Sequence, residues 1–142
     1  MRAKDILDVK GREVVTVSPD AALGSAIDTL AARNIGAVVV VDAGSAPVGI
    51  LSERDVVRLL AGAPTGFRDN RIDSLMTKEP VTVAENATIE AVEGLMTDRR
   101  IRHLPVVEAG RLVGILSIVD VVKHRIEAVK AEADELKGYI QG

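Results

Sequence analysis

The spacing of apolar residues changes several times along the first 61 positions. Three short runs rich in β-branched residues predict strands at residues 14–17, 37–41 and 48–51. Between the first two runs, apolar residues at helical spacing predict the buried face of a helix, formed by Leu23, Ala26, Ile27 and Leu30. A second helix is predicted to begin near Glu53. The predicted order of elements is β-α-β-β-α.

The same pattern returns about 65 residues later. Val15-Thr16-Val17 recurs as Val81-Thr82-Val83, and the sequence VGILS at residues 48–52 recurs at residues 113–117. Self-similarity of this kind indicates a structural repeat. The second copy predicts strands at residues 81–83, 104–107 and 112–116, a helix with its apolar face at Ile89, Val92 and Met96, and a last helix from about Ile118.

We predict an α+β fold in which two β-α-β-β-α repeats pack with pseudo-two-fold symmetry. A repeat of about 60 residues buries only a marginal core on its own, so each is expected to pack against the other. We place the first repeat at residues 1–61, a linker rich in Gly, Pro and polar residues at 62–71, the second repeat at 72–126 and a helical tail at 127–142. The cleft between the repeats is the natural ligand site.

The tail continues the last predicted helix. Its apolar residues alternate four- and three-residue steps, at Val122, Ile126, Val129, Ala133, Leu136 and Ile140, and charged residues flank them. This spacing is typical of a helix that buries one narrow seam. Two interpretations remain open, a helix that lies on its own domain and a seam that pairs two copies of the chain.

The composition excludes several classes of chemistry. The 142 residues include no Cys, which removes disulfides, thiol nucleophiles, iron–sulfur clusters and thiolate zinc sites. Two histidines, His103 and His124, leave little for a metal site of any kind, so we expect none. A net charge of -3 and only two aromatic residues, Phe67 and Tyr139, argue against a nucleic-acid partner.

The apolar runs of the chain are short. None approaches the ~20 residues that cross a bilayer, and the first residues do not show the pattern of a signal peptide. We therefore expect a cytoplasmic protein without a membrane partner.

The sharpest motifs are GILSERD at residues 49–55 and GILSIVD at residues 114–120, each at the end of a predicted strand and the start of a helix. One interpretation is a capping box, in which Ser52 or Ser117 caps the helix and Asp55 or Asp120 completes it. The other is a ligand site, because a carboxylate at a helix N-terminus can accept hydrogen bonds from the vicinal diol of a ribose. Both interpretations can hold together.

Ordered and doubled in this way, the motifs resemble a stand-alone tandem pair of CBS domains, known as a Bateman module. The resemblance rests on residues 15–21, 34–42 and 49–55 and on residues 81–83, 100–108 and 114–120. Members of the family usually bind adenine nucleotides between the two domains. The resemblance therefore implies an adenine nucleotide, with AMP the first candidate and ADP, ATP, NAD or S-adenosylmethionine the others.

The resemblance also implies a role for individual residues. Asp55 and Asp120 would hold ribose hydroxyls, and Ser52 and Ser117 would contact ribose or phosphate. The adenine would face Thr16 and Thr82, the backbone of Ile35, Gly36 and Ala37, and the backbone near Ile101 to His103. One site is expected to combine Thr16, Gly36 and Ala37 with Ser117 and Asp120. The other would combine Thr82 and Pro105 with Ser52 and Asp55.

The two sites are not expected to be equal in charge. Arg102 and His103 stand where family members often place basic phosphate ligands, whereas the first repeat has Gly36 and Ala37 there. We therefore expect a phosphate to favour the first of the two sites. A solvated basic helix end is the alternative interpretation of these cations. Arg54 is a weaker phosphate candidate.

No motif for catalysis is found: the chain has neither a dinucleotide-binding glycine motif nor a phosphate-binding P-loop, and no nucleophile elbow. We expect no enzyme and no catalytic residue. The favoured hypothesis is a regulatory homodimer that senses an adenine nucleotide and signals to a partner protein that the sequence does not name. The alternative is a structural or adaptor dimerisation module without a functional ligand site.

Overall fold

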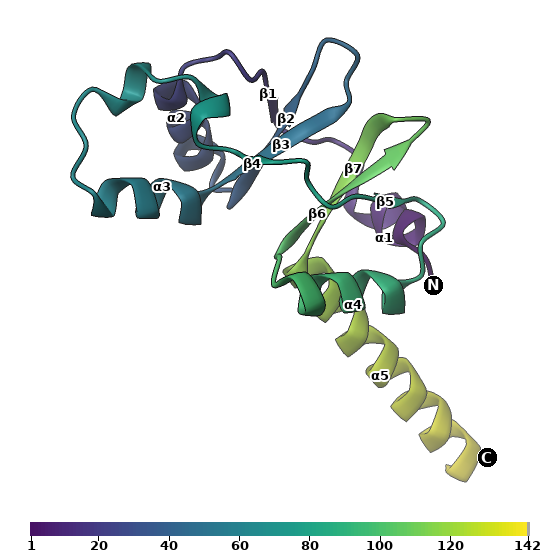
Figure 1. The fold of residues 1–142 in the computed structure, drawn as a ribbon. Helices are drawn as coiled ribbons and strands as arrows, with labels where there is room; N and C mark the ends of the chain where they lie inside the picture. The colour runs from purple at the N-terminus through teal and green to yellow at the C-terminus, as the bar shows by residue number, and fades with distance from the viewer. Residues whose placement is uncertain (142) are drawn as a thin grey trace.

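The computed structural model describes residues 1–141 and shows two similar halves and one projecting helix (Figure 1). The first half contains β1 (Thr16–Val17), α2 (Leu23–Arg33), β2 (Ala37–Val41), β3 (Pro47–Ser52) and α3 (Glu53–Ala61). The second contains β5 (Val83–Ala84), α4 (Ile89–Arg99), β6 (His103–Glu108), β7 (Arg111–Ser117) and α5 (Ile118–Gln141). The predicted β-α-β-β-α order is confirmed in both halves.

Four further elements lie outside that order. They are α1 (Ala3–Lys10), the 3₁₀ turns η1 (Phe67–Asp69) and η2 (Ile72–Ser74), and the short strand β4 (Thr77–Lys78). Strand β4 pairs with β3 and gives the first sheet the order β1-β2-β3-β4, whereas the second sheet has the order β5-β6-β7. The sequence pattern had indicated none of the four.

The two sheets share one topology. In each, the first strand pairs in parallel with the second, and the second forms an antiparallel hairpin with the third. A parallel neighbour needs a crossover connection, which α2 and α4 supply. Both hairpins shift register at the same place, after Val40 in one and after Val106 in the other. The repeat seen in the sequence therefore extends to the backbone, because each hairpin has a register shift at the equivalent position.

Each half has a core of its own. The first core is built from the helix face predicted by periodicity and from alternate strand residues: Leu23, Ala26, Leu30, Val38, Val40, Leu51, Val56 and Ile72. The second contains Ala3, Ile6, Leu7, Val83, Ile89, Val92, Met96, Leu104, Val106, Leu116 and Val121. Val39 and Pro105 are fully buried yet belong to neither core. Because side chains alternate along a strand, Val39 and Pro105 lie on the faces of the sheets opposite to these cores.

The two halves exchange the segments that precede them. Helix α1 precedes the first half but packs in the core of the second, where Leu7 is 0% exposed. Its start is tied there by backbone hydrogen bonds from Ala3 N to Ala87 O (2.8 Å) and from Ile89 N to Met1 O (3.1 Å). Conversely, Ile72, which precedes the second half, is buried in the first core. Each half is thus completed by the chain that leads into the other.

The glycines of the two GILS motifs accommodate this exchange. A Cβ on Gly114 would lie 2.7 Å from Leu7 Cδ1, and a Cβ on Gly49 would lie 2.9 Å from Met76 Cγ. Real Cβ atoms are not found this close to a neighbour, so any larger residue would push the incoming side chain out. Leu7 and Met76 therefore occupy equivalent places in the two halves.

The last helix leaves the body of the molecule after its first turns (Figure 1). The apolar residues of its far part are exposed, with Val129 at 59% and Leu136 at 61%. Of the two interpretations of the tail, a helix lying on its own domain does not describe residues 127–140.

The exchange of α1 predicts a large stability effect from a residue outside both motifs. Leu7→Ala should lower the free energy of unfolding by about 2–5 kcal/mol, because it removes a fully buried side chain and leaves a cavity. Val9→Ala, on the exposed side of the same helix, should change it by less than about 0.5 kcal/mol. Urea denaturation of both variants checks this, and equal effects would contradict the packing of α1.

Candidate functional site

The two Ser–Asp motifs adopt one geometry at the N-termini of α3 and α5. Ser52 N and Ser52 Oγ donate to Asp55 Oδ2 at 2.9 and 3.0 Å, and Asp55 N donates to Ser52 Oγ at 3.3 Å. The corresponding distances for Ser117 and Asp120 are 2.8, 3.0 and 3.2 Å. The predicted capping box is confirmed at both helices.

Capping leaves part of each carboxylate free. Both Asp side chains use Oδ2, and no hydrogen bond among residues 1–141 engages Oδ1 of Asp55 or of Asp120. A carboxylate oxygen can accept two hydrogen bonds, and the helix N-terminus stabilises its negative charge. Each motif therefore presents an oriented acceptor that two neighbouring hydroxyls could reach.

A lysine that the sequence pattern did not indicate contacts Asp120. Lys10, at the end of α1, donates from Nζ to Asp120 Oδ2 (2.6 Å) and to Ile115 O (2.8 Å). Burial by itself would raise the pKa of Asp120, but the hydrogen bonds from Lys10 and Ser117 outweigh burial and hold that pKa below its usual value. The motifs could not have revealed this contact, because it depends on where α1 packs.

The two halves meet at Gly36 and His103. A Cβ on Gly36 would lie 3.3 Å from His103 Cε1 and 3.6 Å from Glu53 Oε1. His103 pairs with Ser117 across the β6–β7 hairpin. Burial lowers the pKa of His103, and the nearby charges of Lys10 and Arg102 act in the same direction against Glu53 and Asp120. The imidazole is therefore neutral at pH 7.

The backbone around these residues repeats as well. Glu53 N donates to Gly36 O at 2.9 Å, and Ile118 N donates to Arg102 O at 2.9 Å. Each helix N-terminus is thus tied to the start of the preceding hairpin strand of its own half. Gly36 and Arg102 are therefore structurally equivalent. The cation predicted to bind phosphate in the second half stands where the first half has a glycine.

The remaining predicted residues are spread over the halves. Ala37 is buried and pairs with Ser52, and Ile35 is half-buried against the first core. Thr82 is half-buried, Pro105 is fully buried, and Arg54 and Arg102 are exposed. Thr16 lines a cavity of about 210 Å³ together with Arg12, Val14, Val41, Ser45 and Leu112. No residue of the two Ser–Asp motifs lines this cavity.

Two classes of site are not found. Among residues 1–141, no group of three or more His, Cys, Asp or Glu side chains is arranged to hold a metal ion. In the same part of the chain, no helix combines the length and the apolar character that crossing a membrane requires.

Comparison with known proteins gives one consistent answer. The family model of the CBS domain matches twice, at residues 3–62 and 72–127. This chain belongs to the CBS-domain family. Both matches include the segment that the fold exchanges between the halves, α1 in one and η2 in the other.

Three relatives show the range of the resemblance. The CBS-domain protein ATU1752 of Agrobacterium tumefaciens has a solved structure with 48% identity and a TM-score of 0.82, covering 88% of this chain and 99% of its own. CBSX2, solved in complex with AMP, has 27% identity and a TM-score of 0.72, covering 81% and 89%. CBSX3 of Arabidopsis thaliana, named as mitochondrial, is 32% identical over 97% of this chain and 71% of its own.

The lowered pKa of His103 predicts a pH effect on stability. The unfolded chain takes up this proton near pH 6.5 and the folded chain only at lower pH, so the free energy of unfolding should fall as pH drops from 7 to 5. His103→Gln should reduce this slope. Urea denaturation at several pH values measures both slopes. Equal slopes in wild type and His103→Gln would contradict the neutral, half-buried imidazole.

Proposed function

We propose that this CBS-domain pair is a regulatory module that binds an adenine nucleotide between its halves and has no chemistry of its own. The observation that carries the proposal is the pair of helix-capping carboxylates, each with Oδ2 fixed by Ser and Oδ1 left available. The AMP bound by its relative CBSX2 supports AMP as the first ligand to test, followed by ADP, ATP, NAD and S-adenosylmethionine.

The proposed contacts follow from the chemistry of the ligand. The vicinal ribose hydroxyls donate to Oδ1 of Asp120 in one site and to Oδ1 of Asp55 in the other. The base lies against aliphatic side chains and peptide planes such as those from Ile35 to Ala37, because the chain has only one Phe and one Tyr. Thr16, Thr82 and Pro105 keep the roles that the family resemblance implies, as residues to be tested.

The phosphate is proposed to lie near Arg102 and His103. Arg102 is exposed and free to turn toward an anion, whereas His103 is neutral in the ligand-free protein. A phosphate beside the imidazole would favour its protonated form, since an opposite charge stabilises the cation. Arg54 offers a weaker contact of the same kind near Asp55.

The proposed signal is a change in how the halves are oriented. The Gly36–His103 contact joins them directly, and α1 crosses from one half to the other, so a ligand between them favours one arrangement over others. A partner protein that recognises that arrangement then responds to a shift in its population. We place the module in the cytoplasm as part of the same proposal.

Ligand binding should raise the thermal stability of the protein. A ligand present at a hundred times its Kd stabilises the folded state by ~2.7 kcal/mol. That corresponds to a rise in Tm of roughly 5–10 °C for a chain of this size. Scanning fluorimetry with AMP, ADP, ATP, NAD and S-adenosylmethionine at millimolar concentration tests it. A constant Tm with all five compounds would favour the structural or adaptor hypothesis.

The two carboxylates should contribute unequally to binding. Asp120→Ala should weaken AMP binding more than Asp55→Ala, because the cations Lys10 and Arg102 lie on the side of Asp120. Both variants remove the same cap, so each serves as the control for loss of helix stability in the other. Isothermal titration calorimetry gives the two affinities. Equal losses would refute the ranking of the sites.

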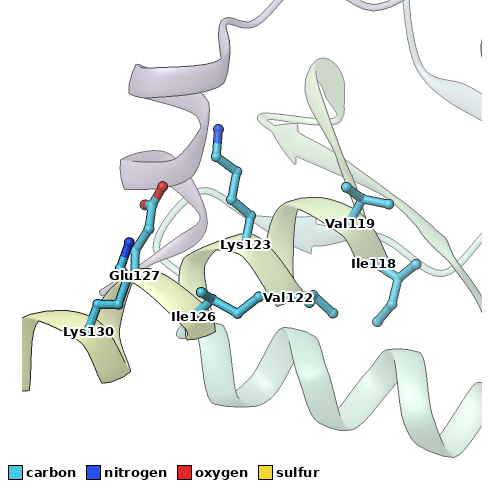
Figure 2. A pocket seen from close by; sticks show the side chains of 7 residues that line it. All are labelled: Ile118, Val119, Val122, Lys123, Ile126, Glu127 and Lys130. Carbon is cyan, nitrogen blue, oxygen red and sulfur yellow. The ribbon is translucent and has the colours of Figure 1, made fainter. Parts of the chain in front are cut away.

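We also propose that α5 pairs two copies of the chain. A groove of about 560 Å³ runs along the helix and is lined by Ile118, Val119, Val122, Lys123, Ile126, Glu127 and Lys130 (Figure 2). Val122 and Ile126 are 50% and 57% exposed, and the four- and three-residue steps continue to Ile140. A second α5 would cover this seam, and the mixed charges along it suit pairing with an identical helix.

Removal of the tail should therefore change the oligomeric state. A chain ending at residue 127 and the full-length variant Val129→Glu/Leu136→Glu should both be monomers, whereas the full chain should be a dimer. The charged pair disrupts the seam without shortening the helix. A control, Ala131→Glu, adds a charge on the side of the helix away from the seam and should remain a dimer. Light scattering coupled to size-exclusion chromatography measures the masses, and a dimer that survives both seam changes would contradict the proposed pairing.

A further inference from the structure

A cation from outside the motifs contacts the Asp120 carboxylate. Lys10 ends α1 and donates to Asp120 Oδ2 and to Ile115 O, and the side chains of Lys10 and Asp120 are 31% and 20% exposed. An ammonium group carries three N–H donors. Contacts within residues 1–141 use two of them, so one donor and the positive charge remain available to a ligand.

The Asp55 motif has the same cap but different charges. Within residues 1–141, no ion pair joins Asp55 to a Lys or Arg, and the neighbouring Arg54 is exposed. The carboxylate of Glu53, the first residue of α3, lies at the contact between the halves, beside Gly36 and His103. The capping carboxylate at the N-terminus of α3 therefore has no paired cation among residues 1–141. The capping carboxylate at the N-terminus of α5 is paired with Lys10.

This difference bears on the charge of a bound ligand. A phosphate group close to an unpaired carboxylate is repelled, and the repulsion is stronger in a partly buried site than in water. Before a phosphate binds, His103 does not offset Asp120, because burial lowers the pKa of the imidazole. Lys10 is in direct contact with Asp120 and does offset it.

We propose that Lys10 determines the charge of the ligand that the Asp120 site accepts. By neutralising Asp120 and keeping one N–H donor free, Lys10 makes this the site for a phosphorylated nucleoside. The Asp55 site, whose carboxylate has no paired cation among residues 1–141, prefers an uncharged nucleoside. Because α1 brings Lys10 to the second half, the selectivity depends on the exchange of segments. The inference rests on the proposed function and specifies which ligand charge each site takes.

The experiment compares AMP with adenosine, which differ only in the phosphate. Titration calorimetry is done in an Asp55→Asn background, so that the Asp120 site is measured. Lys10→Met should weaken AMP binding by about ten-fold or more, which corresponds to about 1.4 kcal/mol. The same change should alter adenosine binding by less than about three-fold, since adenosine carries no charge to be repelled. Lys10→Arg should restore the preference for AMP.

Two further variants serve as a control and as a substitute for Lys10→Met. Lys4→Met removes an exposed lysine from the same helix and should leave both affinities unchanged. Lys10→Gln keeps a hydrogen-bond donor without the charge, and it gives the same measurement should Lys10→Met fail to fold.

The outcomes separate this inference from the proposed function. Equal losses of AMP and adenosine on removal of the Lys10 charge would show that Lys10 only orders Asp120, and would overturn the inference. No change in either affinity would overturn it as well. In both cases AMP binding by the parent Asp55→Asn protein leaves the proposed function standing. If the wild-type chain binds neither of these two compounds and none of ADP, ATP, NAD and S-adenosylmethionine, the proposed function itself fails.

Discussion

The structure depends on the way its two small cores are completed. Neither half closes its core with the residues of its own repeat, because Leu7 fills a place in the second half and Met76 fills the equivalent place in the first. Gly114 and Gly49 leave the necessary space. A half-core of this size would be marginal alone, so the exchange ties the stability of each half to the other. This coupling also holds the halves in the relative orientation that brings Gly36 close to His103.

The candidate site shows how one small motif can serve structure and ligand together. The Ser hydroxyl and the Asp carboxylate satisfy the first turn of the helix, which fixes the carboxylate rotamer before any ligand arrives. Since only Oδ2 takes part, the cap does not compete with an acceptor role for Oδ1. Such preorganisation lowers the entropic cost of binding, because no side chain has to be ordered. The capping and ribose-binding interpretations are therefore compatible in one geometry.

Near-identical motifs nevertheless lie in different electrostatic surroundings. Lys10 pairs with Asp120, whereas among residues 1–141 no Lys or Arg pairs with Asp55. The motifs themselves repeat closely, so they do not cause the difference. It arises because α1, which carries Lys10, packs in the second half. A duplicated fold can in this way keep two copies of a binding geometry and still differentiate their ligands. The exposed seam of α5 provides a separate surface through which two such modules could act together.

Much of the fold followed from the sequence alone. The repeat, the hairpins, the helix faces at Leu23 and Val92 and both capping boxes depend on residues a few positions apart, whose spacing is visible in the sequence. The first strand of each repeat was placed less well: residues 14–17 were predicted where β1 is Thr16–Val17, and residues 81–83 where β5 is Val83–Ala84. Val15 O accepts one hydrogen bond from Val39 N without belonging to a strand. The packing of α1, the Lys10–Asp120 contact and the neutrality of His103 were decided only by the tertiary structure. They join residues about a hundred positions apart, and no local pattern records which half a segment will pack against.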